Sequence, residues 1–231
     1  MSDLVSAVEG GLAAVRERVG AACARAGRAA DSVQLVAVSK GQPAAAIRVA
    51  VAKGQVDFGE SYVQEWVEKR AAIPGVRWHF IGHLQSNKAR LVAGHTALVH
   101  SVDRQSLVDA LSREGGRQDV LVQVNIAGET SKSGVPPEQA AALVAHANAS
   151  GVLSVRGLMC IPPAGDAETV ARPVFRALRE LFVGLRGGMS VDHAARFTEL
   201  SMGMSDDLEV AIEEGATLVR VGTAVFGPRS V

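Results

Sequence analysis

The chain has 231 residues, 48% of them hydrophobic and 21% charged, which is the composition of an ordinary globular protein with a sizeable core. Its 24 basic and 24 acidic residues cancel, so no net charge favours nucleic acid or an anionic membrane as a partner. The sequence carries neither a secretory signal nor an apolar run of the ~18 residues that span a bilayer, and we therefore expect a cytoplasmic protein.

Strand-like and helix-like segments alternate along the chain after a leading amphipathic helix. In that helix, predicted over residues 4–26, apolar side chains recur at three- and four-residue steps. The predicted strands are 33–39, 56–59, 77–81, 97–101, 119–126, 155–160, 198–201 and 218–221. The predicted helices between them are 43–53, 61–72, 86–92, 104–114, 136–149, 167–186 and 206–214, and the eighth helix is short or missing.

This alternation, with short connections, is typical of a parallel sheet. Eight strand–helix units in about 200 residues predict a closed (β/α)8 TIM barrel, in which the leading helix covers the place of the eighth. An open doubly wound sheet is the alternative fold. No linker or repeat divides the sequence, so residues 1–231 are predicted to form a single domain. Cys23 and Cys160 lie far apart and are expected to be buried thiols.

Lys40 stands at the end of the first strand, where barrels of this kind place their functional groups. Alternation along the strand puts Val36, Val38 and Lys40 on one face. A lysine that follows two aliphatic residues would point into the barrel mouth, where desolvation favours the neutral amine that Schiff-base chemistry requires. A solvated lysine at a strand end is the alternative.

Small and hydroxyl-bearing residues gather at the ends of the last two strands. They are Ser201, Met202, Gly203 and Ser205 after the seventh strand, and Gly222 and Thr223 after the eighth. Barrels commonly bind phosphate there through backbone N–H groups and a helix N-terminus. Because closure sets the eighth strand beside the first, a phosphate held there would lie next to Lys40, which is the outline of a pyridoxal 5'-phosphate (PLP) site. Helix capping by Ser205 and a simple turn at Gly222 are the alternatives.

Arg220 shares a face of the last strand with Leu218 and Gly222 and is predicted to point into the barrel. A permanent cation there needs a partner. The pyridine nitrogen of PLP is one candidate, and a guanidinium donor would keep that nitrogen unprotonated and weaken the ring as an electron sink. An internal salt bridge to Glu60 or Glu199 is the other.

Six segments carry a resemblance to a known family. They are residues 37–40, 58–65, 78–88, 157–159, 200–207 and 220–227. In this order they resemble the YggS/PROSC family of PLP homeostasis proteins, over about residues 33 to 227. In one position the sequence departs from the family, because Ser61 stands where an Asn is usual. A hydroxyl cannot make the two-ended contact of an amide.

The resemblance implies a fold-type III PLP barrel, similar to the barrel domain of bacterial alanine racemase, with Lys40 as the Schiff-base lysine. It implies that Arg220 lies at the pyridine nitrogen. It also implies that the phosphate lies among Ser201, Ser205, Gly222 and Thr223, with Met202 and Gly203 in the same loop. Family members have no established reaction, so the resemblance implies a carrier or buffer of PLP that acts in vitamin B6 homeostasis, with PLP-dependent apoenzymes as acceptors.

Further residues are expected at the barrel mouth. His79 would orient substituents of the ring, Asn125 would be a buried hydrogen-bonding residue, and Met159 would pack either on the ring or in the core. His79 and His83 are close in sequence, but no carboxylate stands at a ligand spacing, so no metal site is predicted. The polar loop 130–134 either is solvated or binds a second anion.

Three functions compete. The first is a non-catalytic PLP carrier, either monomeric or weakly dimeric. The second is a small PLP-dependent amino-acid racemase with Lys40 as base, and the third is a PLP-free phosphosugar-type barrel enzyme. Racemases of this fold add a β-domain and use a tyrosine base from the partner subunit, whereas this sequence ends soon after residue 227 and its one tyrosine, Tyr62, is predicted on a helix. We therefore expect the carrier.

Overall fold

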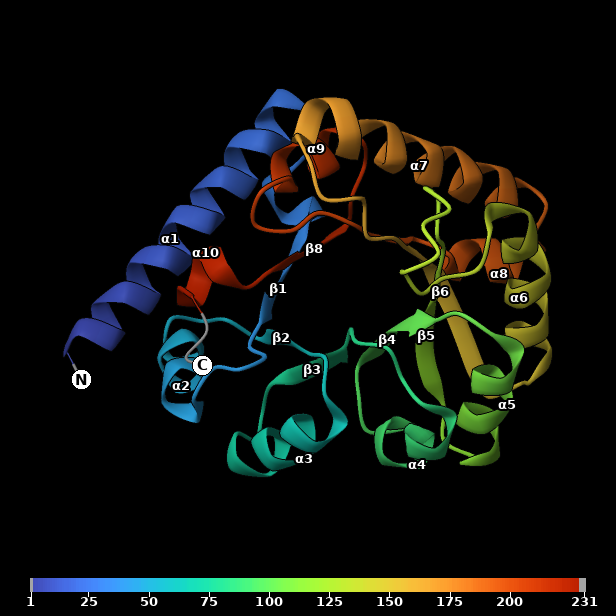
Figure 1. Cartoon of the computed structure of the whole chain (residues 1–231), viewed down its shortest axis with the longest axis horizontal. Helices are drawn as coiled ribbons and strands as arrows, with labels where there is room; N and C mark the ends of the chain where they lie inside the picture. The colour runs from blue at the N-terminus through green and yellow to red at the C-terminus, as the bar shows by residue number, and fades with distance from the viewer. Residues whose placement is uncertain (1, 229–231) are drawn as a thin grey trace.

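A closed barrel of eight parallel strands forms the centre of the computed structural model, which describes residues 2–228 (Figure 1). The strands are β1 (Gln34–Val38), β2 (Asp57–Glu60), β3 (Arg77–Phe80), β4 (Leu98–Val102), β5 (Gln118–Gln123), β6 (Leu153–Met159), β7 (Glu199–Ser201) and β8 (Leu218–Val221). They neighbour one another in chain order, and β1 pairs with β8 to close the ring, with Val36 opposite Arg220. The predicted TIM barrel is confirmed, and the open sheet is wrong.

Helices surround this barrel and follow the strands in turn. They are α2 (Ala44–Ala52), α3 (Val63–Ala72), α4 (Ala89–Val92), α5 (Gln105–Arg113), α6 (Pro137–Ala149), α7 (Arg172–Gly187), α8 (Val191–Arg196), α9 (Leu208–Glu213) and α10 (Thr223–Phe226). Short 3₁₀ turns occur at η1 (Ala30–Ser32) and η2 (Ser86–Lys88), and a π-helical turn, η3 (Ala167–Ala171), precedes α7. Among the described residues, no helix is both long and apolar enough to cross a membrane.

The structure differs from the predicted helices at three places. The helix expected over 167–186 begins with the π-helical turn η3 and becomes α-helical only at Arg172. The helix expected over 86–92 is divided into the η2 turn and α4. After α7, a separate helix α8 was not predicted. Glycines at 187 and 188 end α7, and the Ser190 side chain accepts a hydrogen bond from the backbone N–H of His193 to begin α8.

The leading helix, α1 (Ser2–Arg25), takes the place that the short eighth helix leaves open. It lies along α2, α9 and α10 on the outside of the barrel (Figure 1). Gly11 permits this approach, because a Cβ atom there would lie 2.5 Å from the carbonyl oxygen of Val225. The prediction that this helix covers the eighth position is confirmed.

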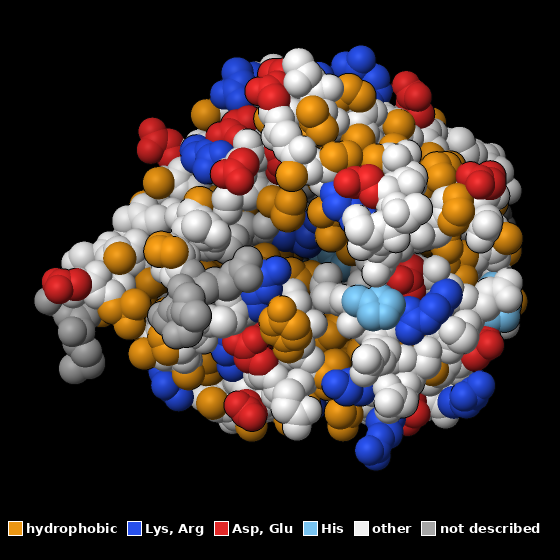
Figure 2. All heavy atoms as spheres, in the orientation of Figure 1, with side chains coloured by type: hydrophobic (Ala, Val, Ile, Leu, Met, Phe, Trp, Pro, Cys, Tyr) orange, Lys and Arg blue, Asp and Glu red, His pale blue; other side chains and the backbone are white. Residues whose placement is uncertain are grey.

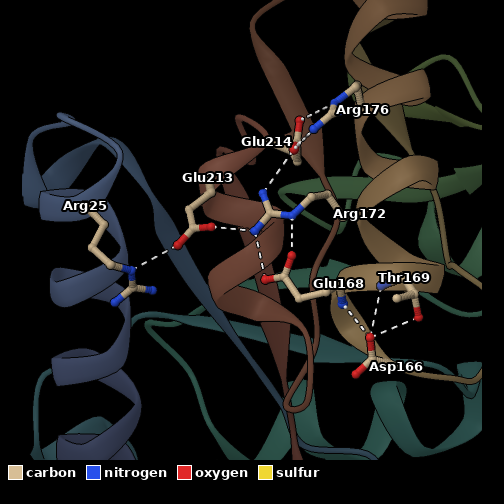
Figure 3. Close-up of polar contacts among 8 residues, drawn as sticks. All are labelled: Arg25, Asp166, Glu168, Thr169, Arg172, Arg176, Glu213 and Glu214. Atoms are coloured by element: carbon tan, nitrogen blue, oxygen red, sulfur yellow. Dashed lines mark hydrogen bonds and ion pairs between the residues drawn. The ribbon is translucent and has the colours of Figure 1, made fainter.

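An ion-pair network holds the helices behind β7 and β8 together (Figure 3). The Arg172 guanidinium on α7 contacts Glu168 at 2.6 Å, Glu213 at 2.7 Å and Glu214 at 3.1 Å. Glu213, on α9, also pairs with Arg25 of α1 at 3.0 Å. Single surface pairs contribute little, but a shared guanidinium links three elements in one arrangement. Helix α9, which follows β7, is therefore held by ion pairs to α7 on one side and to α1 on the other.

A small apolar layer fills the inside of the barrel. It consists of Val36, Leu98, Leu121, Met159 and Leu218, all buried. The inward positions of Val36 and Leu218 agree with the predicted faces of β1 and β8. Outside the barrel, a larger apolar core joins the strands to the helices. Cys160 and Cys23 belong to that outer core as free buried thiols, as expected.

Candidate functional site

A cavity of about 230 Å³ opens at the carboxyl ends of β7, β8, β1 and β2. It is lined by Val38, Lys40, Gln42, Ser61, Ile81, Ile161, Met204, Ser205, Asp206, Arg220, Gly222, Thr223 and Gly227. Figure 2 shows a hollow near the middle of this face, with basic side chains in and beside it. A cavity of about 340 Å³ at the opposite end lies between α1 and the amino ends of the first strands. The carboxyl ends are where barrels of this fold place their chemistry.

Half of the residues predicted for the site line this cavity. They are Lys40, Ser61, Ser205, Arg220, Gly222 and Thr223. Lys40 follows β1 and is half-buried, and the residues after β7 and β8 stand beside it because β8 pairs with β1. The sequence reasoning missed six residues of the lining, although four of them lie within segments that it had singled out. They are Gln42, Ile81, Ile161, Met204, Asp206 and Gly227.

Ser201, Met202 and Gly203 are not in the cavity lining. Ser201 is fully buried, with its hydroxyl 2.6 Å from the Arg220 guanidinium. Met202 is buried in the outer core. Gly203 has a φ of +94°, and a Cβ atom there would lie 2.6 Å from the Ala211 side chain. Its role in the structure is to turn the chain tightly against α9.

His79, Asn125 and Met159 also lie elsewhere than expected. His79 is buried inside the barrel and lines a cavity at the amino ends of the strands, not the mouth. Asn125 is only half-buried, and its side chain donates to the Glu129 carbonyl at 2.8 Å, which closes the loop after β5. Met159 packs in the apolar layer inside the barrel, which agrees with the alternative that it belongs to the core.

The turn that carries Lys40 is held by a buried cluster that the sequence reasoning did not foresee. The Lys69 amine, on α3, donates to the Ser39 carbonyl at 2.6 Å, to Glu60 Oε1 at 2.8 Å and to Glu65 Oε1 at 2.6 Å. The Ser39 hydroxyl donates to Glu60 Oε1 at 2.6 Å, and the backbone N–H of Gly41 donates to Glu65 at 2.6 Å. The residues on both sides of Lys40 are therefore fixed.

Glu60 is a fully buried member of this cluster. Its side chain has no exposed surface, and burial raises the pKa of its carboxyl despite the hydrogen bonds from Lys69 and Ser39. Its second oxygen, Oε2, has no hydrogen-bond partner among the described residues. The only sequence signal for the cluster was the spacing of Glu65 and Lys69, which is that of an ion pair along a helix.

Arg220 lies at the floor of the cavity and is 4% exposed. Its guanidinium donates to the Ser201 hydroxyl at 2.6 Å and to the Cys160 carbonyl at 3.0 Å. Glu60 pairs with Lys69, and Glu199 accepts from Thr217, so the predicted salt bridge of Arg220 to either carboxylate is wrong. Burial lowers the pKa of Arg220, because nothing adjacent fully offsets its loss of hydration.

One wall of the cavity is built of the small and hydroxyl-bearing residues Ser205, Gly222 and Thr223. Ser205 Oγ accepts from the backbone N–H of Ala224 at 3.3 Å, which joins the loop after β7 to the start of α10. A Cβ atom on Gly222 would lie 3.2 Å from the Val38 carbonyl oxygen, so a side chain there would crowd the wall. The cavity therefore offers an amine, a buried cation and hydroxyl donors, which suit a small anion that carries an amine-reactive group.

Cys160, whose backbone carbonyl accepts a hydrogen bond from Arg220, carries a thiol that is expected to be unreactive. Burial raises its pKa to about 12, and the thiolate is the reactive form. We expect neither Cys160 nor the buried Cys23 to react with Ellman's reagent at mildly alkaline pH until the protein is unfolded, when both should react. A thiol titrated rapidly in the native protein would contradict this.

Comparison with known proteins decides the family. The alanine racemase N-terminal domain family matches residues 11–230 of the sequence. The chain belongs to this family. Relatives within it include the pyridoxal phosphate homeostasis protein of Pseudomonas aeruginosa, which is 46% identical over 97% of both chains. The protein of the same name from Escherichia coli is 42% identical, over 94% of this chain and 95% of that one.

Solved structures agree with this membership of the alanine racemase N-terminal domain family. PipY of Synechococcus elongatus, solved with PLP bound, is 38% identical with a TM-score of 0.81, over 95% of this chain and all of PipY. Alanine racemase from Corynebacterium glutamicum has a TM-score of 0.73 at 16% identity, over 94% of this chain and 62% of the racemase. That second similarity concerns the fold alone.

Proposed function

We propose that the chain binds PLP at the barrel mouth, with Lys40 as the point of covalent attachment, and that it serves PLP homeostasis as a carrier or buffer. The observation that carries the proposal is the cavity that Lys40 and Arg220 share with Ser205, Gly222 and Thr223. The names of the relatives and the PLP bound to PipY support the same cofactor.

The residues present fit this cofactor. A side chain at position 222 would fill the space beside the Val38 carbonyl, so the glycine keeps the wall open to a phosphate. The hydroxyls of Ser205 and Thr223 would donate to the phosphate oxygens, and Arg220 would stand at the pyridine nitrogen. When bound, PLP supplies an electrophilic aldehyde and an electron-withdrawing ring. A permanent cation that donates to the ring nitrogen keeps that nitrogen unprotonated and restrains the withdrawing power.

The proposed role is non-catalytic, which the names of the relatives as homeostasis proteins support. Racemases of this fold take their tyrosine base from the partner subunit, and within this chain Tyr62, the only tyrosine in the sequence, is 63% exposed and is not part of the cavity lining. The described part of the chain therefore offers no tyrosine base at the cavity, although Lys40 alone remains a base to be tested.

The test combines binding with turnover. Titration of the purified protein with PLP is expected to produce a new visible absorption band, whereas pyridoxal, which lacks the phosphate, should bind much more weakly. The loaded protein should then reactivate a PLP-dependent apoenzyme. Incubation with D- and L-alanine in deuterated water should exchange the α-proton no faster than free PLP does. Enzyme-like exchange would overturn the carrier role, and the absence of any band would overturn PLP binding.

A further inference from the structure

A continuous row of buried polar side chains crosses the inside of the barrel from the cavity to the opposite end. Arg220 Nη1 lies 2.6 Å from Ser201 Oγ, which lies 2.8 Å from His100 Nδ1. His100 Nε2 lies 2.9 Å from His79 Nδ1, and His79 Nε2 lies 3.0 Å from Asp57 Oδ1. All five side chains are buried. Arg220 lines the mouth cavity, and Asp57 lines the cavity at the amino ends of the strands.

The two ends of the row restrict the directions that its hydrogen bonds can take. An arginine can only donate, and an ionised carboxylate can only accept. Asp57 is ionised, because hydrogen bonds from His79 and Arg77 outweigh the opposing effect of burial and hold its pKa below the usual value. Arg77 reaches both carboxylate oxygens, at 2.8 and 2.7 Å. When both imidazole rings are neutral, the one order that gives each ring nitrogen a partner has the protons pointing from Arg220 towards Asp57.

This direction assigns a tautomer to each histidine. Ser201 accepts from Arg220 and donates to His100 Nδ1, so the proton of the His100 ring sits on Nε2. That proton is donated to His79 Nδ1, and the proton of the His79 ring, also on Nε2, is donated to Asp57. In this arrangement both rings are neutral and each of their nitrogens has a partner. Burial, with the nearby Arg220, also holds the pKa of His100 well below its usual value, which favours the neutral form of this ring.

We propose that His100 and His79 are positioning residues for Arg220. As neutral Nε2–H tautomers they orient the Ser201 hydroxyl so that its oxygen, not its proton, faces the guanidinium. With the Cys160 carbonyl as second acceptor, Arg220 is held by two of its donors, and a remaining N–H is available to the cavity. The order of hydrogen bonds does not depend on PLP, whereas its consequence for the ring nitrogen rests on the proposed function.

The row itself is tested in the protein without cofactor. Long-range ¹H–¹⁵N correlation spectra of the imidazoles, at neutral pH, should show two rings as neutral Nε2–H tautomers, assigned by their loss in His79→Gln and His100→Gln. An Nδ1–H tautomer or an imidazolium at either residue would overturn the proposal. This measurement gives its answer whether or not the chain binds PLP.

The consequence for Arg220 is tested with PLP added. His100→Phe should weaken PLP binding about tenfold and shift the visible band, because Ser201 then loses the acceptor that orients it. Leu121→Met, a volume-conserving change in the neighbouring apolar layer, should alter neither. Should His100→Phe not fold, Ser201→Ala interrupts the same row and carries the same expectation. Unchanged binding and band in the folded variant would overturn the positioning role. Failure of the parent protein to bind PLP would instead overturn the proposed function.

Discussion

Replacing Lys40 with alanine is expected to abolish covalent attachment of PLP to the protein. Lys40 is the lysine of the cavity lining, and the rest of that lining offers no second amine, since Arg220 is a guanidinium. After treatment with PLP and borohydride, mass spectrometry of the parent protein should find one modified peptide, which contains residue 40. The same treatment of Lys40→Ala should leave that peptide unmodified.

A matched control for this experiment is Lys53→Ala. Lys53 follows α2 at the opposite end of the barrel, where it pairs with Glu9 at 3.0 Å. This variant should attach PLP as the parent does. The cavity wall of Ser205, Gly222 and Thr223 is unchanged in Lys40→Ala, and so is Arg220. That variant should therefore still bind PLP reversibly, though more weakly. Modification of another lysine in the parent, with residue 40 untouched, would refute the assignment.

Replacing Lys69 with methionine is expected to destabilise the protein by about 3–5 kcal/mol, the usual effect of leaving a buried charge without its partner. Lys69 donates to Glu60, Glu65 and the Ser39 carbonyl, and Glu60 has no exposed surface to recover hydration. Equilibrium urea denaturation should measure the loss. The double variant Glu60→Gln with Lys69→Met should recover part of it, since no buried charge remains.

The pH dependence of this variant follows from the same cluster. Burial already raises the pKa of Glu60 in the folded state, and removal of Lys69 takes away a hydrogen bond that lowers it. A carboxyl whose folded pKa lies above its unfolded value destabilises the fold at high pH and ceases to do so as pH falls through the folded pKa. The loss in Lys69→Met should therefore shrink towards acid pH. The exposed Lys53→Met should lose less than about 1 kcal/mol at any pH, and an equal loss in both variants would contradict the argument.

The barrel and the composition of its mouth were predictable because both depend on regular patterns. Eight repeats of strand and helix leave few topologies, and the pairing of β1 with β8 follows from closure. Alternation along a strand then places Lys40 and Arg220 correctly, since parity is a local property of the sequence. Those two facts brought the amine and the cation together without any knowledge of side-chain packing.

The depth of a side chain inside the barrel was not predictable. His79 has the inward parity that the sequence indicates, but the stagger of the strands sets it level with Gly59 and Leu98, below the mouth. Ser201 faces inward as well, and the long side chain of Arg220 reaches it from β8. The stagger is a property of the closed ring, and a single strand does not reveal it.

Lys69 was missed for a different reason. Lysine on a surface helix is ordinarily solvated, and the helical pattern of α3 gives no sign that this one turns inward. Only the position of Glu60, at the end of the neighbouring strand, makes the inward orientation favourable, and that partnership needs the fold. Asn125 shows the same dependence, because the backbone leaves β5 at Gln123 and folds back to Val135.

The close contact between Gly11 and the backbone of Val225 joins an early part of the chain to a late one, and it is therefore relevant to the order in which the fold forms during synthesis. Lys40 emerges early from the ribosome, whereas its neighbours on β8 and the backbone that Gly11 touches emerge nearly two hundred residues later. A nascent chain thus displays the Lys40 amine long before the residues after β7 and β8 stand beside it. The proposed binding of PLP is consequently restricted to the folded barrel, and a chain that lacks β8 is expected to bind none.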